Sequence, residues 1–288
     1  MQRRSFLGAL GGLPAVAMAS SITNVASPRV ASGKRVGRRV GIAFGGGSMH
    51  GIAHVGVLKA FAEKKVKVEF IAGTSVGAIV GVLAAAQLPL SQIDTVTRSI
   101  EWPGLMSLSW SGKGLLQNAK LRKVIDKALG DRKIEQLPIA FGAIATDLAT
   151  GARVLIRKGA AGIAVDASCS IPVFFTPVKI DGRELVDGGL TEPVPVIALR
   201  EMGADIVIGV DVAYRPNEDQ FKGFSGVAFQ TMHIMANALI KEQIGRADVA
   251  ITMNLHRFVG HDNARDQLIE AGYKATMLAW PRIAGLIA

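Results

Sequence analysis

Short apolar runs alternate with helix-like patterns along most of this chain. A continuous apolar run of strand length indicates a buried strand, whereas apolar residues three or four positions apart indicate a helix. In the first half these patterns predict strand 39–44, helix 50–65, strand 67–73 and helix 76–86. A strand, helix, strand order implies parallel strands whose following loops both leave the carboxyl edge of the sheet. The loop 45–48 should therefore lie beside Ser75.

The second half continues the alternation. Strands are predicted at 138–147, 153–158, 204–211 and 247–254, and long helical patterns at Phe224–Gln243 and from Ala264 onward. Strands that alternate with helices are typical of α/β proteins. We therefore expect an α/β fold, a three-layer α/β/α sandwich with a mainly parallel central sheet.

One uncharged run, Phe70–Ile93, is long enough on paper to span a bilayer. Its glycines and Pro89 interrupt it, and the continuous helical part, Val76–Ala86, is shorter than the ~20 residues that a spanning helix needs. We interpret it as a buried helix.

Composition narrows the class of protein. The chain has 288 residues, 49% of them hydrophobic, and 33 glycines, which favours an α/β enzyme over a disordered chain. Its net charge of +10 favours an anionic partner, with nucleic acid, an anionic membrane surface and an acidic substrate as candidates; a basic surface that only keeps the protein soluble is the alternative. Aromatic residues make up only 6% of the chain and are not interleaved with basic runs, so no nucleic-acid partner is expected. Cys169 is the only cysteine, which excludes an intrachain disulfide and a cysteine metal cluster.

The amino terminus has the features of an export signal. Arg3 and Arg4 precede Ser-Phe-Leu and an uncharged apolar segment that reaches Ala19. This pattern resembles a twin-arginine signal, with small residues at 17–19 for cleavage. We expect residues 1–19 to be this signal, 20–38 a linker and 39–288 the folded catalytic domain, in a periplasmic or secreted protein. An uncleaved membrane anchor is the alternative.

The stretch "FIAGTSVGAIVG" contains a candidate nucleophile, Ser75. Gly-Thr-Ser-Val-Gly lies between a predicted strand and a predicted helix, the context of a nucleophile elbow. Gly73 and Gly77 would allow neighbouring backbone to approach the turn, and the helix would direct its positive end toward the serine. An ordinary strand-to-helix turn is the alternative.

The loop "FGGGSMHG", residues 44–51, offers backbone N–H groups at the start of a helix. Such groups bind either a phosphate or an oxyanion. The spacing does not fit the dinucleotide fingerprint Gly-x-Gly-x-x-Gly, and no acidic residue closes a following strand at the expected place. With Ser75 expected beside this loop, an oxyanion site is the preferred interpretation.

Three aspartates end predicted strands and could take the proton of Ser75: Asp147, Asp187 and Asp211. The sequence barely separates them, although Gly188 and Gly189 after Asp187 would let its backbone pass close to another element.

Histidines offer a rival scheme. A Ser-Asp-His triad in the chain order of α/β-hydrolases would use one of three bases, His233, His256 or His261. Nothing around these residues is motif-like, and each is expected to be a surface or helix residue. His54 is expected to be packed within the first helix.

Five stretches together resemble the bacterial patatin-like phospholipases, in order from about Val40 to the carboxyl terminus: "GIAFGGGSMHGIAHVGVLKAF", "IAGTSVGAIVGVL", "ATDLATG", "ASCSIPVFFTPVKIDGRELVDGGLTEPVPV" and "GADIVIGVDV". The resemblance implies a serine lipid acyl hydrolase that needs no metal or organic cofactor and acts on phospholipids or other acyl esters. It implies a dyad, with Ser75 as nucleophile and Asp187 as base. The N–H groups of Gly46, Gly47 and Ser48 would hold the oxyanion.

The chain departs from the family pattern at three positions. Ser48 replaces the third glycine of the family's loop, and His50 replaces the usual Arg or Lys, so a positive charge is present there only when the imidazole is protonated. Glu192 stands where the family often has Asn, and we expect it to alter how Asp187 is held. A lipid-binding protein with a degraded catalytic site is therefore an alternative.

The segment Glu101–Gln117 contains two tryptophans, Met106 and several leucines. Long irregular segments in compact domains are often functional. We interpret this one as an apolar lid over a lipid site, with an ordinary packed connection as the alternative.

Overall fold

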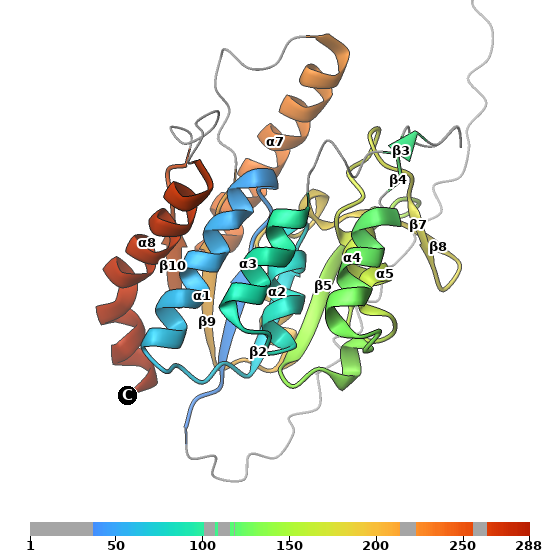
Figure 1. The fold of residues 1–288 in the computed structure, drawn as a ribbon. Helices are drawn as coiled ribbons and strands as arrows, with labels where there is room; N and C mark the ends of the chain where they lie inside the picture. Colours follow the sequence, from blue (N-terminus) through green and yellow to red (C-terminus); the bar gives the residue numbers. More distant parts are fainter. Residues whose placement is uncertain (1–36, 101–106, 109–115, 118, 214–222, 256–263) are drawn as a thin grey trace, which may run out of the picture. The chain divides into compact units, whose positions relative to one another are not determined.

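The computed structural model describes residues 37–100, 107–108, 116–117, 119–213, 223–255 and 264–288 (Figure 1). The expected signal 1–19, almost all of the expected linker and most of the expected lid 101–117 lie outside the described residues. The part of the lid that is described is a short antiparallel pair, β3 (Ser107–Leu108) with β4 (Leu116–Gln117).

The central sheet is mainly parallel, as predicted. Its strands lie in the order β10-β9-β1-β2-β5-β8-β7, and β6 also pairs with β5. The parallel strands are β1 (Val40–Phe44), β2 (Phe70–Thr74), β5 (Ala140–Asp147), β9 (Ile206–Asp211) and β10 (Val249–Thr252). The antiparallel strands are β6 (Arg153–Ile156), β7 (Val178–Ile180) and β8 (Arg183–Asp187). A short connection between β5 and β6 suits only an antiparallel pair, because parallel strands need a long crossover.

Helices cover both faces of the sheet, which confirms the three-layer α/β/α prediction (Figure 1). One face carries α1 (Ala53–Glu63), α2 (Val76–Ala85), α3 (Leu90–Ser99), α4 (Ala119–Leu129), α5 (Ala161–Ser168) and α8 (Ala264–Ile287). The opposite face carries α6 (Val196–Met202) and α7 (Gly223–Ile244). Three short 3-10 helices are η1 (Ser48–Ile52), η2 (Ile134–Gln136) and η3 (Gly188–Leu190).

Both faces of β1 are buried, as expected for a strand inside a parallel sheet. Ile42 and Phe44 belong to the core beneath α1 and α2, whereas Ala43 belongs to the core beneath α6. Successive side chains of β1 thus point into two different cores, which explains why its sequence is apolar throughout.

The uncharged run Phe70–Ile93 divides into β2, α2 and the start of α3, and all ten residues of α2 are buried. This confirms its interpretation as a buried helix. Among the described residues, no helix combines the length and the apolar character needed to cross a membrane. The predicted helix 50–65 begins with a 3-10 turn, η1, before α1.

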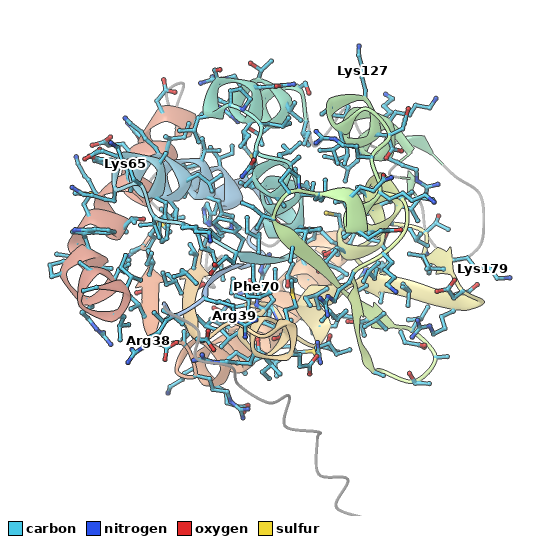
Figure 2. All side chains as sticks on the ribbon, turned by 90° about the horizontal axis from the view of Figure 1, so that it is seen from below. Arg38, Arg39, Lys65, Phe70, Lys127 and Lys179 are labelled. Atoms are coloured by element: carbon cyan, nitrogen blue, oxygen red, sulfur yellow. The ribbon has the colours of Figure 1, made fainter. Side chains whose placement is uncertain are left out.

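Figure 2 shows the molecule from below, with Arg38 and Arg39 near each other beside Phe70, and Lys65, Lys127 and Lys179 farther out. Arg39 pairs with Asp205, Nε to Oδ2 at 3.2 Å, and its guanidinium lies 5.3 Å from the centroid of the Phe70 ring.

Helices α1 and α8 pack with their backbones in direct contact. A Cβ on Gly56 of α1 would lie 1.8 Å from the carbonyl oxygen of Ile269, and one on Gly272 of α8 would lie 1.9 Å from that of Ala53. No side chain fits at either position. Helix α8 therefore packs directly against α1, the helix that follows the glycine loop.

Replacing Gly56 with Ala is expected to destabilise the protein by about 1–3 kcal/mol, because the added methyl group must push two helices apart. Gly285→Ala is the matched control in α8, where a Cβ would meet nothing within 4 Å. It should be neutral or stabilise the protein by up to about 1 kcal/mol, because Ala favours a helix more than Gly. Urea unfolding of both variants measures the difference, and equal stabilities would contradict the close contact.

Candidate active site

Ser75 forms the turn between β2 and α2. Its backbone has φ 54° and ψ −125°, a conformation rare for any residue except glycine, and the residue is only 8% exposed. Its N–H donates to the hydroxyl oxygen of Ser168, at the end of α5, over 2.9 Å. This hydrogen bond from α5 thus stabilises the strained turn at Ser75.

The flanking glycines allow this turn to lie against β1. A Cβ on Gly77 would lie 2.1 Å from the carbonyl oxygen of Phe44, and a Cβ on Gly73 would lie 2.4 Å from the carbonyl oxygen of Gly77. Any side chain at Gly77 would therefore separate the first turn of α2 from the glycine loop.

Asp187 is the last residue of β8 and pairs with Ala145 of β5. Its N–H donates to the Ser170 carbonyl at 2.9 Å, and its carbonyl accepts from the Thr146 hydroxyl at 3.0 Å. Its carboxylate accepts from the Gly189 N–H, Oδ1 to N at 2.7 Å. Gly188 is required here because a Cβ would lie 2.4 Å from the carbonyl oxygen of Ile144.

Burial makes the Asp187 carboxyl a stronger base than an ordinary aspartate. Its pKa is raised to about 6 because burial disfavours the charged form, while hydrogen bonds from the Gly189 N–H and the Ser75 side chain act in the opposite direction. The group is ionised above this pH and can accept a proton near neutrality.

Ser75 and Asp187 line one cavity of about 80 Å³. Its other lining residues come from the glycine loop, from the segments that follow α5 and β8, from Ala213 after β9, and from the inner face of α7: Gly46, Gly47, Ser48, Ile171, Pro172, Gly189, Leu190, Pro193, Ala213, Phe229, Met232, His233, Ala236, Asn237 and Ile240. The walls are mostly apolar, which suits a hydrophobic ligand.

The glycine loop does not offer all the donors that were expected. The Gly46 N–H donates to the Pro193 carbonyl at 2.9 Å, and the Gly45 N–H donates to the Val210 carbonyl at 3.0 Å. We expected the Gly46 N–H to bind the oxyanion, and this expectation needs correction. The N–H already donates to Pro193, and this hydrogen bond fixes the loop to the segment before α6. Gly47 and Ser48 remain the candidate donors, since the first N–H groups of a helix have no partner within it.

His54 supports the same loop from inside α1. It is fully buried, and its Nε2 donates to the Gly45 carbonyl at 2.8 Å, which places the ring proton on that nitrogen. Burial lowers the pKa of His54 to about 4, so the ring is neutral at physiological pH. As expected, His54 is packed rather than catalytic, yet it also holds the loop that faces Ser75.

The other two candidate aspartates stabilise turns. The Asp147 carboxylate accepts from the N–H groups of Ala149 at 3.0 Å and Thr150 at 3.2 Å. The Asp211 carboxylate accepts from the Ala213 N–H at 2.9 Å. Both side chains therefore have structural roles at the carboxyl ends of their strands.

Of the three histidines of the rival triad, only His233 lies among the described residues, because His256 and His261 lie outside them. His233 is on α7, lines the cavity with Ser75, and packs against Phe229 with ring centroids 5.3 Å apart. Burial lowers its pKa.

The Glu192 carboxylate is directed away from Asp187, toward α6 and Arg153. Its Oε1 accepts from the N–H groups of Ile197 at 2.7 Å and Ala198 at 3.0 Å at the start of α6, and its Oε2 lies 3.3 Å from Arg153 Nη1. Burial raises its pKa. His50, another of the three positions that depart from the family pattern, is buried within η1.

Sequence reasoning missed Ser168. The only signal was two small polar residues, Ser168 and Ser170, beside Cys169 in an otherwise apolar stretch. Within the described ranges, no group of three His, Cys, Asp or Glu residues could hold a metal ion.

Known proteins resemble this chain in sequence and in fold. A family model described as patatin-like phospholipase matches residues 42–200. An uncharacterised NTE family protein of Mycobacterium tuberculosis is 36% identical over 177 residues, which are 60% of this chain and 49% of that protein. Patatin-like phospholipase domain-containing protein 7 of Rattus norvegicus is 33% identical over 193 residues, 64% of this chain but 14% of that protein. The match thus spans about half of the mycobacterial relative.

The crystal structure of VipD from Legionella pneumophila superimposes with a TM-score of 0.58 and 14% sequence identity, over 85% of this chain and 67% of VipD. At this identity the likeness concerns the fold alone.

Replacing Asp187 with Asn is expected to stabilise the protein at about pH 8 by on the order of 2 kcal/mol, because a buried charge is removed and the acceptor for Gly189 is kept. The pKa of Asp187 is raised from 3.8 to about 6 on folding, so its contribution to stability is full below the lower value and is lost as pH rises through the upper one. The two proteins should therefore be equally stable at about pH 3, below both pKa values. Urea unfolding at both pH values measures this, and equal stability at about pH 8 would contradict a raised pKa.

Replacing Ser168 with Ala is expected to slow the reaction of Ser75 with a fluorophosphonate by about tenfold, because the Ser75 N–H loses its acceptor. Ser168→Thr should restore the rate, since it keeps a hydroxyl. Ser170→Ala is the matched control, because Ser170 is equally buried but donates to the Asp166 carbonyl at 2.8 Å. A similar slowing in both alanine variants would show that Ser168 has no specific role in holding Ser75.

Proposed function

This chain belongs to the patatin-like phospholipase family, a family of lipid hydrolases, and from that premise we propose that it hydrolyses acyl ester bonds of phospholipids with a Ser75–Asp187 dyad. The observation that carries the proposal is that both side chains line one apolar cavity, where the pKa of Asp187 is raised to about 6. A serine hydroxyl is a weak nucleophile unless a base takes its proton, and this carboxylate is such a base.

In the first half of the reaction, Asp187 accepts the proton of Ser75 while Oγ attacks the ester carbonyl carbon. The carbonyl oxygen becomes an oxyanion, for which the N–H groups of Gly47 and Ser48 are the proposed donors. The C–O bond to the alcohol then breaks, and Asp187 returns the proton to the departing alcohol. The product is an acyl ester on Ser75.

In the second half, Asp187 accepts a proton from a water molecule that attacks the acyl ester. The bond between the acyl carbon and Ser75 Oγ breaks, and the proton passes from Asp187 to Oγ. A fatty acid leaves, and both residues return to their starting state.

The elbow geometry supports this chemistry. The positive φ of Ser75 turns the chain abruptly from β2 into α2, and the serine stands at the amino end of that helix. The partial positive charge of the helix amino end favours negative charge that develops nearby.

A triad based on His233 has less support. The pKa of Asp187 responds to burial, Gly189 and Ser75, and His233 is not among these causes. A catalytically impaired lipid-binding protein is the other alternative. The engaged N–H of Gly46 and the serine at position 48 favour it.

The test compares Ser75→Ala and Asp187→Ala with Asp147→Asn, a matched change of a carboxylate that stabilises a turn, on purified protein with phosphatidylcholine and 4-nitrophenyl esters. Each dyad variant is expected to lose at least about a hundredfold in kcat, whereas Asp147→Asn should lose far less. Wild-type kcat/KM should fall below about pH 6, as Asp187 becomes protonated.

Two results would overturn the dyad. Wild-type turnover by Asp187→Ala, together with a loss in His233→Gln as large as that in Ser75→Ala, would favour the triad. An absence of hydrolysis by the wild type, together with no fluorophosphonate labelling of Ser75, would favour the lipid-binding alternative.

A further inference from the structure

A second cavity lies on the other side of η1 from the catalytic one. Its volume is about 440 Å³, and helices α2, α3 and the start of α8 form its walls with η1. Its apolar lining consists of Met49, Ile52, Val76, Ile79, Val80 and Ile100. Its size falls within the ~300–1,000 Å³ typical of small-molecule sites.

The polar groups in its wall are already engaged. Arg98 pairs with Asp94 at 2.8 Å and with Asp266 at 3.3 Å. Arg265 pairs with the same Asp94 at 2.7 Å and donates to the Thr97 hydroxyl at 2.6 Å. Their positive charges are thus largely balanced by carboxylates, and most of the remaining lining is apolar, so the site suits an apolar ligand.

This cavity adjoins the proposed catalytic site at η1. Ser48 lines both cavities, and Val76, in the wall of the second, directly follows Ser75 in the chain. The catalytic cavity measures only about 80 Å³, too little for a long acyl chain, whereas the second is more than five times larger.

The second cavity opens to solvent at η1. Met49 belongs to its lining and is 53% exposed, whereas Ile79 and Val80 at its base are fully buried. Methionine is flexible and adapts to ligands of different shape. An apolar chain can therefore enter at Met49 and contact the buried side chains of Ile79 and Val80.

We propose that the second cavity binds an acyl chain of the lipid on which the dyad acts; this inference rests on the proposed function. A chain attached to a carbonyl at Ser75 extends past Ser48 into the apolar cavity. Each buried methylene strengthens binding roughly fourfold, so the cavity makes the enzyme prefer long acyl chains.

The first experiment maps the chain without requiring catalysis. A palmitic acid analogue with a photoreactive diazirine near its methyl end is bound to the wild type and to Ser75→Ala, and the cross-linked peptides are identified by mass spectrometry. We expect cross-links at Met49, Ile52 or Ile79 in both proteins, displaced by excess palmitate. Cross-links confined to Phe229 and Met232 of α7, or none that palmitate displaces, would overturn the proposal.

The second experiment fills the cavity. Ile52→Trp is compared with Leu278→Trp, a matched control on α8 whose side chain is 86% exposed and lines neither cavity. The ratio of kcat/KM for lauroyl to butyryl 4-nitrophenyl ester is expected to fall at least about tenfold in Ile52→Trp, because several methylenes lose their site. An equal loss on both esters, or the same change of ratio in Leu278→Trp, would contradict it.

The two proposals fail in different ways. Palmitate-displaceable cross-links at the second cavity in a protein that hydrolyses no ester would overturn the dyad and leave the acyl-chain site standing. Hydrolysis that depends on Ser75 and Asp187, without those cross-links and without a changed ratio in Ile52→Trp, would overturn the acyl-chain site alone.

Discussion

The close approach of α2 to the end of β1 is the contact on which the candidate site depends. A Cβ on Gly77 would meet the Phe44 carbonyl at 2.1 Å, so only glycine lets the Ser75 turn lie against the loop that follows β1. Parallel pairing of β1 with β2 brings both segments to the same edge of the sheet. The candidate nucleophile and its candidate oxyanion donors are therefore neighbours because two backbones touch.

Around this contact, buried side chains stabilise the strained Ser75 turn and the glycine loop, and burial changes the pKa of Asp187. The Ser168 hydroxyl accepts from the Ser75 N–H, and neutral His54 donates to the Gly45 carbonyl behind the loop. Burial of the Asp187 carboxyl disfavours its ionised form, which costs stability above about pH 6 but makes the group a better base. The same burial thus opposes stability and favours the proposed reaction.

Helix η1 lies between two cavities that differ in size and lining. On one side lies the small cavity that contains Ser75 and Asp187, and on the other a larger apolar cavity whose arginines are already paired. A short helix that shares Ser48 with both is suited to separate the reacting ester from its acyl chain. In the proposed enzyme, ester hydrolysis would therefore take place on one side of η1, and the acyl chain would bind on the other side.

The sequence by itself determined the parts of this protein that depend on local patterns. Apolar periodicity predicted β1, β2 and α2 because strand and helix repeats differ, and glycines around Ser75 indicated a sharp turn. It could not separate Asp187 from Asp147 and Asp211, because each follows an apolar strand.

Only the tertiary structure distinguishes their surroundings: Asp187 lines a cavity with Ser75, whereas Asp147 and Asp211 accept hydrogen bonds within turns. Ala145 of β5 pairs with Asp187, and the adjacent Ile144 pairs with Thr74, so the register of three strands sets the acid near the serine. The engagement of the Gly46 N–H by Pro193, and the contact of Ser168 with Ser75, likewise join residues far apart in the chain. Such contacts leave no periodic trace in a sequence, because they depend on how whole elements pack.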